Sequence, residues 1–181
     1  MERIEKLANE YLEGSAKAAY DLGVIYYYGE NNIPKDYEEA FKLFKYAKEN
    51  GIIEAGHFLG MCYMYGYGTE KNEELAIQIT YEAAEAGCGS STNDIGFSYA
   101  MGIYFEKNDE ESVKWYKKAV ELGNEKAMRN LAMCYRSGIG TNIDQVESFK
   151  LFKMAYEYGS KAALVAITKV PLLLSTSAGD S

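Results

Sequence analysis

The chain has 181 residues, of which 48% are hydrophobic and 25% are charged. This composition is typical of one folded domain and excludes a disordered protein. The formal net charge is −8 and the lysines are scattered, which excludes nucleic acid as a partner, because binding a phosphate backbone depends on clustered Lys and Arg.

The sequence carries no targeting or cross-linking pattern. Residues 1–6 include two glutamates where a secretory signal would be apolar. The longest apolar stretch, 162–174, is too short to span a membrane and contains Lys169 and Pro171. The three cysteines have no CxxC spacing and predict neither a disulfide framework nor a zinc site. We therefore expect a cytoplasmic protein with no membrane contact; a translocated bacterial effector is the alternative.

Residues 1–14 are predicted to form an N-terminal capping helix, and a repeated unit follows. A motif of the form Leu-Gly-x-x-Tyr-x-x-Gly recurs with its tyrosine at steps of 37, 36 and 36 residues, at Tyr26, Tyr63, Tyr99 and Tyr135. An alanine and a glycine four residues apart recur at steps of 36, beginning with Ala47 and Gly51. Such a period predicts stacked supersecondary units. The predicted repeats are 15–51, 52–87, 88–123 and 124–159.

Each repeat is expected to contain two helices. Good N-cap residues mark the start of the second helix at Asp36, Asn72, Asn108 and Asp144. An acid three residues later predicts a capping box in three of the repeats, with Glu39, Glu111 and Glu147. The glycines that end these helices are expected to be left-handed C-caps: Gly51, Gly87, Gly123 and Gly159. Small residues in the first helix predict a close approach to the second: Gly23, Gly60, Gly96 and Ala132.

The pattern weakens after residue 159. Ala163 continues the register of a fifth first helix, but Pro171 then stands where a repeat tyrosine is expected. Residues 160–174 are therefore predicted to be a partial repeat or cap. The polar segment 175–181 is predicted to be a disordered tail.

These motifs resemble the Sel-one-like repeat family of the tetratricopeptide-like superfamily. The resemblance is carried by Ala55-x-x-x-Leu59-Gly60-x-x-Tyr63-x-x-Gly66-Tyr67-Gly68, followed by Ala83-Ala84-Glu85-Ala86-Gly87. It implies an all-α fold: a right-handed α/α superhelical solenoid of antiparallel helix pairs, with four full repeats and partial capping helices. The third repeat departs from the pattern, because Tyr104 replaces the second glycine. The family also implies the role of an adaptor or scaffold for other proteins, although a fold does not determine a function.

A protein-binding groove is predicted along the first helix of each repeat. On a helical wheel, the register of residues 129, 133 and 136 lies about 120° from the core stripe, and in this superfamily the first helix lines the concave wall. Most of these positions are apolar, whereas a solvated face is normally charged. The predicted groove residues are Tyr20, Val24, Tyr27, His57, Met61, Met64, Asn93, Phe97, Arg129, Met133 and Arg136. Because the last repeat is basic there, we expect a partner protein or peptide with apolar or aromatic side chains and an acidic end. The competing interpretation is that this stripe packs in the core.

Catalysis is not expected. His57 is the only histidine, and it is expected to line the groove or to pack. Cys62 and Cys134 are expected to be buried packing residues, and Cys88 an exposed thiol in a turn. No catalytic residues, metal ligands or cofactor are predicted. Two alternatives to a scaffold remain: a regulatory inhibitor or cap of an enzyme, and a hydrolase-like enzyme such as the cysteine-rich branch of the family, whose paired cysteines are missing here.

Overall fold

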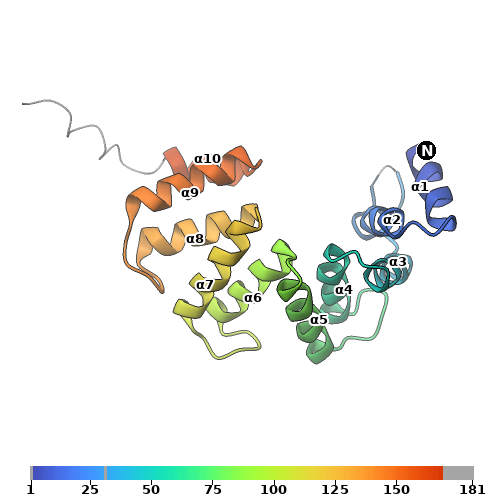
Figure 1. Ribbon diagram of the computed structural model, residues 1–181, viewed down its shortest axis with the longest axis horizontal. Helices are drawn as coiled ribbons and strands as arrows, with labels where there is room; N and C mark the ends of the chain where they lie inside the picture. Colours follow the sequence, from blue (N-terminus) through green and yellow to red (C-terminus); the bar gives the residue numbers. More distant parts are fainter. Residues whose placement is uncertain (1, 31, 169–181) are drawn as a thin grey trace, which may run out of the picture. The chain divides into compact units, whose positions relative to one another are not determined.

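A computed structural model describes residues 2–30 and 32–168, and within these ranges all regular structure is α-helical. Figure 1 shows the helices following one another in chain order. Their bounds are α1 Glu2–Leu12, α2 Ala16–Tyr28, α3 Tyr37–Glu49, α4 Glu54–Tyr65, α5 Glu73–Glu85, α6 Gly89–Met101, α7 Asp109–Glu121, α8 Glu125–Ser137, α9 Gln145–Glu157 and α10 Lys161–Thr168. The predicted all-α class and the sequential antiparallel helix pairs are confirmed. The tail predicted at 175–181 lies outside the described residues.

The helices pack as two compact units, Met1–Ile95 (unit 1) and Gly96–Ser181 (unit 2). In unit 1, α1 packs against α2, α2 against α3, α3 against α4, and α4 against α5. In unit 2, α8 packs between α7 and α9, and α9 also packs against α10. Helix α6 contributes residues to both units.

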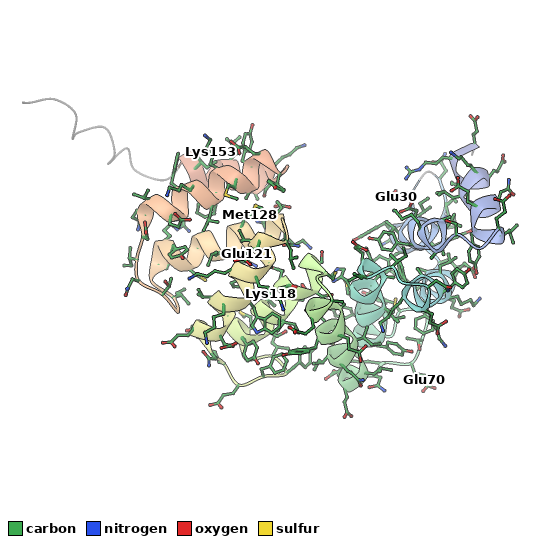
Figure 2. The ribbon with its side chains drawn as sticks, in the orientation of Figure 1. Glu30, Glu70, Lys118, Glu121, Met128 and Lys153 are labelled. Carbon is green, nitrogen blue, oxygen red and sulfur yellow. The ribbon has the colours of Figure 1, made fainter. Side chains whose placement is uncertain are left out.

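Apolar residues at repeat positions form the core of each unit. In unit 1, Leu22, Leu43 and Ala47 belong to one buried cluster, and Phe44 and Phe58 to a second. In unit 2, the core includes Met128, Leu131 and Phe152. Figure 2 shows Met128 within the packed helices of unit 2 and Glu70 in the loop between α4 and α5. Neither helix of a pair buries its apolar face alone, so stacking is what removes this surface from water.

The predicted second-helix caps are confirmed. The side chains of Asp36, Asn72, Asn108 and Asp144 each accept a hydrogen bond from the backbone N–H three residues later. The predicted glycines are left-handed, with φ between 75° and 104°. The N–H of the residue after each of these glycines donates to the carbonyl of the repeat alanine at 2.9 Å, for example Ile52 to Ala47. Both ends of the second helix are therefore satisfied by local bonds.

The capping boxes form only in part, which corrects the sequence-based expectation. The backbone N–H of Asp36 donates to the carbonyl of Tyr26 at 3.0 Å, and the same bond recurs at 2.8–3.0 Å in the other repeats. The N-cap N–H is thus already satisfied by the tyrosine of the first helix. Glu39 instead pairs with Lys42, at 3.2 Å between Oε2 and Nζ, and Glu111 and Glu147 pair with their own i+3 lysines in the same way.

The small residues of the first helices permit the predicted close approach. A Cβ atom on Gly23 would lie 2.7 Å from the Phe44 ring, and one on Gly96 would lie 2.8 Å from the Tyr116 ring. A Cβ on Gly60 would lie 2.4 Å from Thr80 Oγ1. Each of these contacts joins the two helices of one repeat. A small residue therefore recurs at this position because the two helices approach each other closely there.

The thiols are free and buried at Cys62, Cys88 and Cys134. This confirms the packing role expected for Cys62 and Cys134. It corrects the expectation for Cys88, whose exposed fraction is only 4%. Cys88 directly precedes α6, and its carbonyl accepts a bond from the Thr92 hydroxyl at 2.8 Å, so the turn containing it is drawn into the core.

Two equivalent serines provide a matched stability test. Ser148 Oγ donates to the Ala132 carbonyl at 2.8 Å, whereas the buried Ser112 Oγ, 36 residues earlier, has no hydrogen-bond partner in the described structure. We expect Ser148→Ala to lower the free energy of unfolding by about 1 kcal/mol, because a buried bond is lost. Ser112→Ala should raise it by about 1 kcal/mol, because an unpaired hydroxyl is removed. Urea unfolding of both variants checks this; effects of the same sign would contradict it.

Candidate protein-binding surface

The predicted groove residues of unit 1 divide into two groups. Most are half-buried on the first helices α2 and α4, and so are open in part to solvent: Tyr20, Val24, His57, Met61 and Met64. The other two, Tyr27 and Asn93, have exposed fractions of only 6% and 5%. The structure therefore places these two inside the unit rather than on an open wall.

Tyr27 is buried because aromatic side chains from other elements cover it. Its ring centroid lies 5.4 Å from that of Phe58, 5.5 Å from that of Tyr37 and 5.9 Å from that of Tyr67. Its hydroxyl donates to Met61 Sδ at 3.9 Å. Burial raises the pKa of the Tyr27 hydroxyl well above its usual value, and Cys62 and Tyr67 add to the shift. Tyr27 is thus a core aromatic that supports its more exposed neighbours.

Exposed tyrosine or methionine side chains lie one position after the predicted stripe on α2, α4 and α6. Tyr28 is 52% exposed and Tyr65 is 60% exposed, and the two residues are 37 positions apart, at the same point of the repeat. In unit 2, Met101 occupies this point and is 58% exposed. Sequence reasoning missed this position, although the repeat period marks it. The open stripe follows an i, i+4, i+8 spacing, so it continues from residues 20 and 24 to 28 and not to 27.

Six half-buried or exposed side chains of α2 and α4 are grouped here under the name tyrosine face: Tyr20, Val24, Tyr28, His57, Met61 and Tyr65. The ring of Phe58 joins its parts, because its centroid lies 5.9 Å from that of Tyr20, 6.2 Å from that of Tyr28 and 5.2 Å from that of His57. Phe58 itself is 8% exposed and stacks on Phe44 at 4.6 Å. Tyr20, Tyr28 and His57 of the tyrosine face therefore rest on packed aromatic rings.

Carboxylates border the tyrosine face. Burial raises the pKa of Tyr20 to about 12, and the nearby charges of Glu54 and Asp21 contribute to the shift. Lys17 lies 5.0 Å from the centroid of the Tyr20 ring, and its ammonium forms an ion pair with Asp21. A further carboxylate lies next to His57, whose Nδ1 is 3.0 Å from Asp94 Oδ2 of α6.

The predicted residues of unit 2 are partly exposed, and the two arginines among them contact neighbouring side chains. Phe97 and Met133 are 46% and 43% exposed. Arg129 Nε lies 3.7 Å from Glu125 Oε1. Arg136 lies with its guanidinium carbon 5.6 Å from the centroid of the Phe152 ring and donates from Nη2 to Met133 Sδ at 2.8 Å. Both arginines thus have partners within unit 2.

The described residues offer little for chemistry. Among them, no group of three or more His, Cys, Asp and Glu side chains is placed to hold a metal ion. Burial raises the pKa of the Cys62 thiol to about 12, so at neutral pH it is protonated and a poor nucleophile. No helix in the described part of the chain is both long and apolar enough to cross a membrane.

Comparisons with known proteins agree with the repeat pattern. The family model "Sel1 repeat" matches residues 16–52, 53–88, 90–124 and 125–160. The chain is 37% identical over 65 residues to an uncharacterized Sel1-like repeat-containing protein of Schizosaccharomyces pombe, a match that covers 36% of this chain and 10% of the relative.

Two solved structures are also similar. One is c5321, described as a protective antigen of uropathogenic Escherichia coli that displays an SLR fold; it is 32% identical with a TM-score of 0.70, over 91% of this chain and 35% of the antigen. The other is a Sel1 repeat protein from Oxalobacter formigenes, which is 24% identical with a TM-score of 0.75, over 92% of this chain and 74% of that one. This chain spans about a third of the antigen and a tenth of the yeast relative.

Proposed function

We propose that this chain, which belongs to the Sel1 repeat family, binds a partner protein through the tyrosine face of unit 1. Repeat proteins of this kind generally mediate protein interactions through the surfaces that stacked helices expose. The observation that carries the proposal is the repeated exposure of Tyr28 and Tyr65, which are 52% and 60% exposed at one repeat position. A helix face that only meets water normally carries charged side chains there.

The composition of the tyrosine face supports the proposal. Tyrosine and methionine are enriched at the centres of protein interfaces, where tyrosine supplies a large contact area with a polar end. Few rotamers are lost when these tyrosines bind, so the entropic cost of binding is small. The buried rings of Phe44, Phe58 and Tyr27 hold the surface from below. A preorganised apolar surface of this kind can act as a binding hot spot.

We propose that unit 2 makes a separate, weaker contribution to binding the partner protein. Phe97 and Met133 offer exposed apolar surface, and Lys126 is an exposed cation at the start of α8. An acidic partner segment matches this charge. Arg129 and Arg136 would have to exchange their present contacts with Glu125 and Phe152 for contacts with that segment, which lowers the net gain.

Paired tyrosine substitutions test the proposal. The double variant Tyr28→Ala/Tyr65→Ala should weaken capture of a partner from native lysate by about 10-fold or more, because truncating a hot-spot tyrosine costs about 2 kcal/mol or more. Quantitative mass spectrometry of tagged protein after capture provides the measurement. Thermal unfolding should change little, because both side chains are largely exposed.

The matched control is Tyr156→Ala/Tyr158→Ala on the second-helix side of unit 2, where the two side chains are 46% and 62% exposed. This variant also removes two exposed tyrosine side chains, but from a different surface. We expect it to keep the partners of the wild-type chain. Equal retention by both double variants would reject the tyrosine face as the binding site.

A further inference from the structure

The two units differ in charge. Residues 1–95 contain 17 acidic and 8 basic side chains, a formal charge of −9, whereas residues 96–181 contain 10 acidic and 11 basic side chains, a charge of +1. The acidity of the whole chain thus belongs to unit 1, which carries the tyrosine face. A field of one sign over a binding surface attracts partners of the opposite sign and raises their association rate.

Several cations of unit 1 are already paired on other surfaces. Lys6 pairs with Glu10 on α1, Lys42 with Glu39 on α3, and Lys48 of α3 with Glu82 of α5. Each of these pairs also contains a carboxylate, so none of them offsets the negative charge beside the tyrosine face. These three lysines therefore do not neutralise the carboxylates beside the tyrosine face.

Next to the tyrosine face, the carboxylates outnumber the cations. Lys17 lies beside Tyr20 but is paired with Asp21. Asp94 lies 3.0 Å from His57, and the amide nitrogen of Asn93 lies 3.4 Å from the Asp94 carboxylate. Glu54, in the first turn of α4, acts on the Tyr20 hydroxyl, and no described lysine or arginine forms an ion pair with it. Glu54 is thus a negative charge at the edge of an aromatic surface.

Electron-rich tyrosine rings beside a carboxylate form a suitable environment for a cation. An ammonium or guanidinium group over a tyrosine ring gains about 0.5–2 kcal/mol, depending on how far it is desolvated. Hydrogen bonds between such a group and a carboxylate are about twice as strong as neutral ones. The aliphatic stem of Lys or Arg can at the same time lie along apolar side chains such as Met61.

We infer that the tyrosine face recognises a cationic segment of a partner protein, in which Lys or Arg stands beside aliphatic or aromatic residues. The inference rests on the proposed function and names the chemistry of its partner. The apolar residues of the segment contact Tyr28, Met61 and Tyr65, and its cation lies between Tyr20 and Glu54. This partner differs from the acidic segment that suits unit 2.

Three synthetic peptides of equal length test the inference. They share regularly spaced leucines and differ only in carrying lysine, glutamine or glutamate at the intervening positions. Binding is followed by NMR of the protein labelled at its methionine methyl groups, and affinities are measured by titration calorimetry. We expect the lysine peptide to shift the signals of Met61 and Met64, but not that of Met128, which is only 1% exposed in the core of unit 2.

The affinities carry the quantitative expectation. The lysine peptide should bind about 10-fold more tightly than the glutamine peptide, and the glutamate peptide most weakly. Raising the salt concentration should reduce the difference, because exposed charges are screened. Glu54→Gln should lower the affinity for the lysine peptide by about 3-fold or more and leave the affinity for the glutamine peptide unchanged. Glu74→Gln, the same change at an exposed site on α5, is the control and should leave both affinities unchanged.

Each other outcome rejects the inference in a distinguishable way. If the lysine and glutamine peptides bind equally tightly and shift Met61 and Met64 alike, the cationic preference is refuted while the proposed function stands. The same conclusion follows if Glu54→Gln has no more effect than Glu74→Gln. If no peptide shifts these signals at about 1 mM, the inference fails, and the proposed function is decided by the capture experiment with Tyr28 and Tyr65.

Discussion

Gly140→Ala is expected to lower the free energy of unfolding of unit 2 by about 3 kcal/mol. A Cβ atom at this position would lie 2.1 Å from the carbonyl oxygen of Asp109 and 2.9 Å from the backbone nitrogen of Glu110. These are backbone atoms at the start of α7, so no side-chain rotation can relieve the clash. Overpacking of this kind costs about 1–3 kcal/mol, and a left-handed backbone adds about 1–2 kcal/mol for a residue with a Cβ. The φ angle of Gly140 is 65°.

The same packing recurs in unit 1, where a Cβ on Gly68 would lie 2.0 Å from the carbonyl oxygen of Tyr37. Urea unfolding measures both variants. The matched control is Gly159→Ala, because Gly159 is also left-handed, with φ of 104°, but a Cβ there meets no atom within 4 Å. It should cost only the backbone penalty of about 1–2 kcal/mol. If Gly140→Ala is no more destabilising than Gly159→Ala, the inter-repeat contact does not limit stability.

Phe44→Ala is expected to destabilise unit 1 by about 4 kcal/mol, within the range for deleting a buried phenylalanine ring. Phe44 is fully buried and stacks on Phe58 at 4.6 Å. Its ring also lies 6.1–6.2 Å from the rings of Tyr20 and Tyr27 and fills the space next to Gly23. Truncation leaves a cavity beneath the tyrosine face, and the surrounding helices can close it only in part.

Thermal and urea unfolding provide the measurement, with Phe97→Ala as the control. Phe97 is 46% exposed, so removing the same ring there should cost about 1 kcal/mol or less. Near-ultraviolet circular dichroism should also change in Phe44→Ala, because several tyrosine rings lose their fixed surroundings. A loss of stability equal to that of Phe97→Ala would show that the aromatic layer is not what holds α2 and α4 together.

The fold was largely predictable because its signals are local and recur. An N-cap residue, a left-handed glycine and a small residue facing the partner helix each act within one repeat, and the period aligns them across four repeats. Bonds that depend on loop geometry were not predictable in this way. The N–H of Asp36 donates to the Tyr26 carbonyl across a loop, and the sequence does not show that this bond displaces the second half of the capping box.

The candidate surface was predicted less well, for a related reason. A helical wheel places Tyr27 and Tyr20 on one side of α2, but it does not show which side chains from loops and other helices pack against that side. Tyr67, from the turn after α4, and Tyr37, at the start of α3, cover Tyr27 and leave its neighbour Tyr28 open. The period alone pairs Tyr28 with Tyr65 and would have marked the open position. What it could not supply is how much of each ring its neighbours cover.

The bond from the N-cap N–H to the tyrosine carbonyl has a consequence for how these repeats can diverge. It fastens the two ends of each inter-helix loop to each other, at 3.0 Å in the first repeat and 2.8–3.0 Å in the others, although the first loop is one residue longer. The two helices of a repeat can therefore pair in the same way when the loop between them differs in length. Natural variation or a designed graft can lengthen these segments while the scaffold beneath keeps its form, so new contact residues can be acquired without redesigning the core.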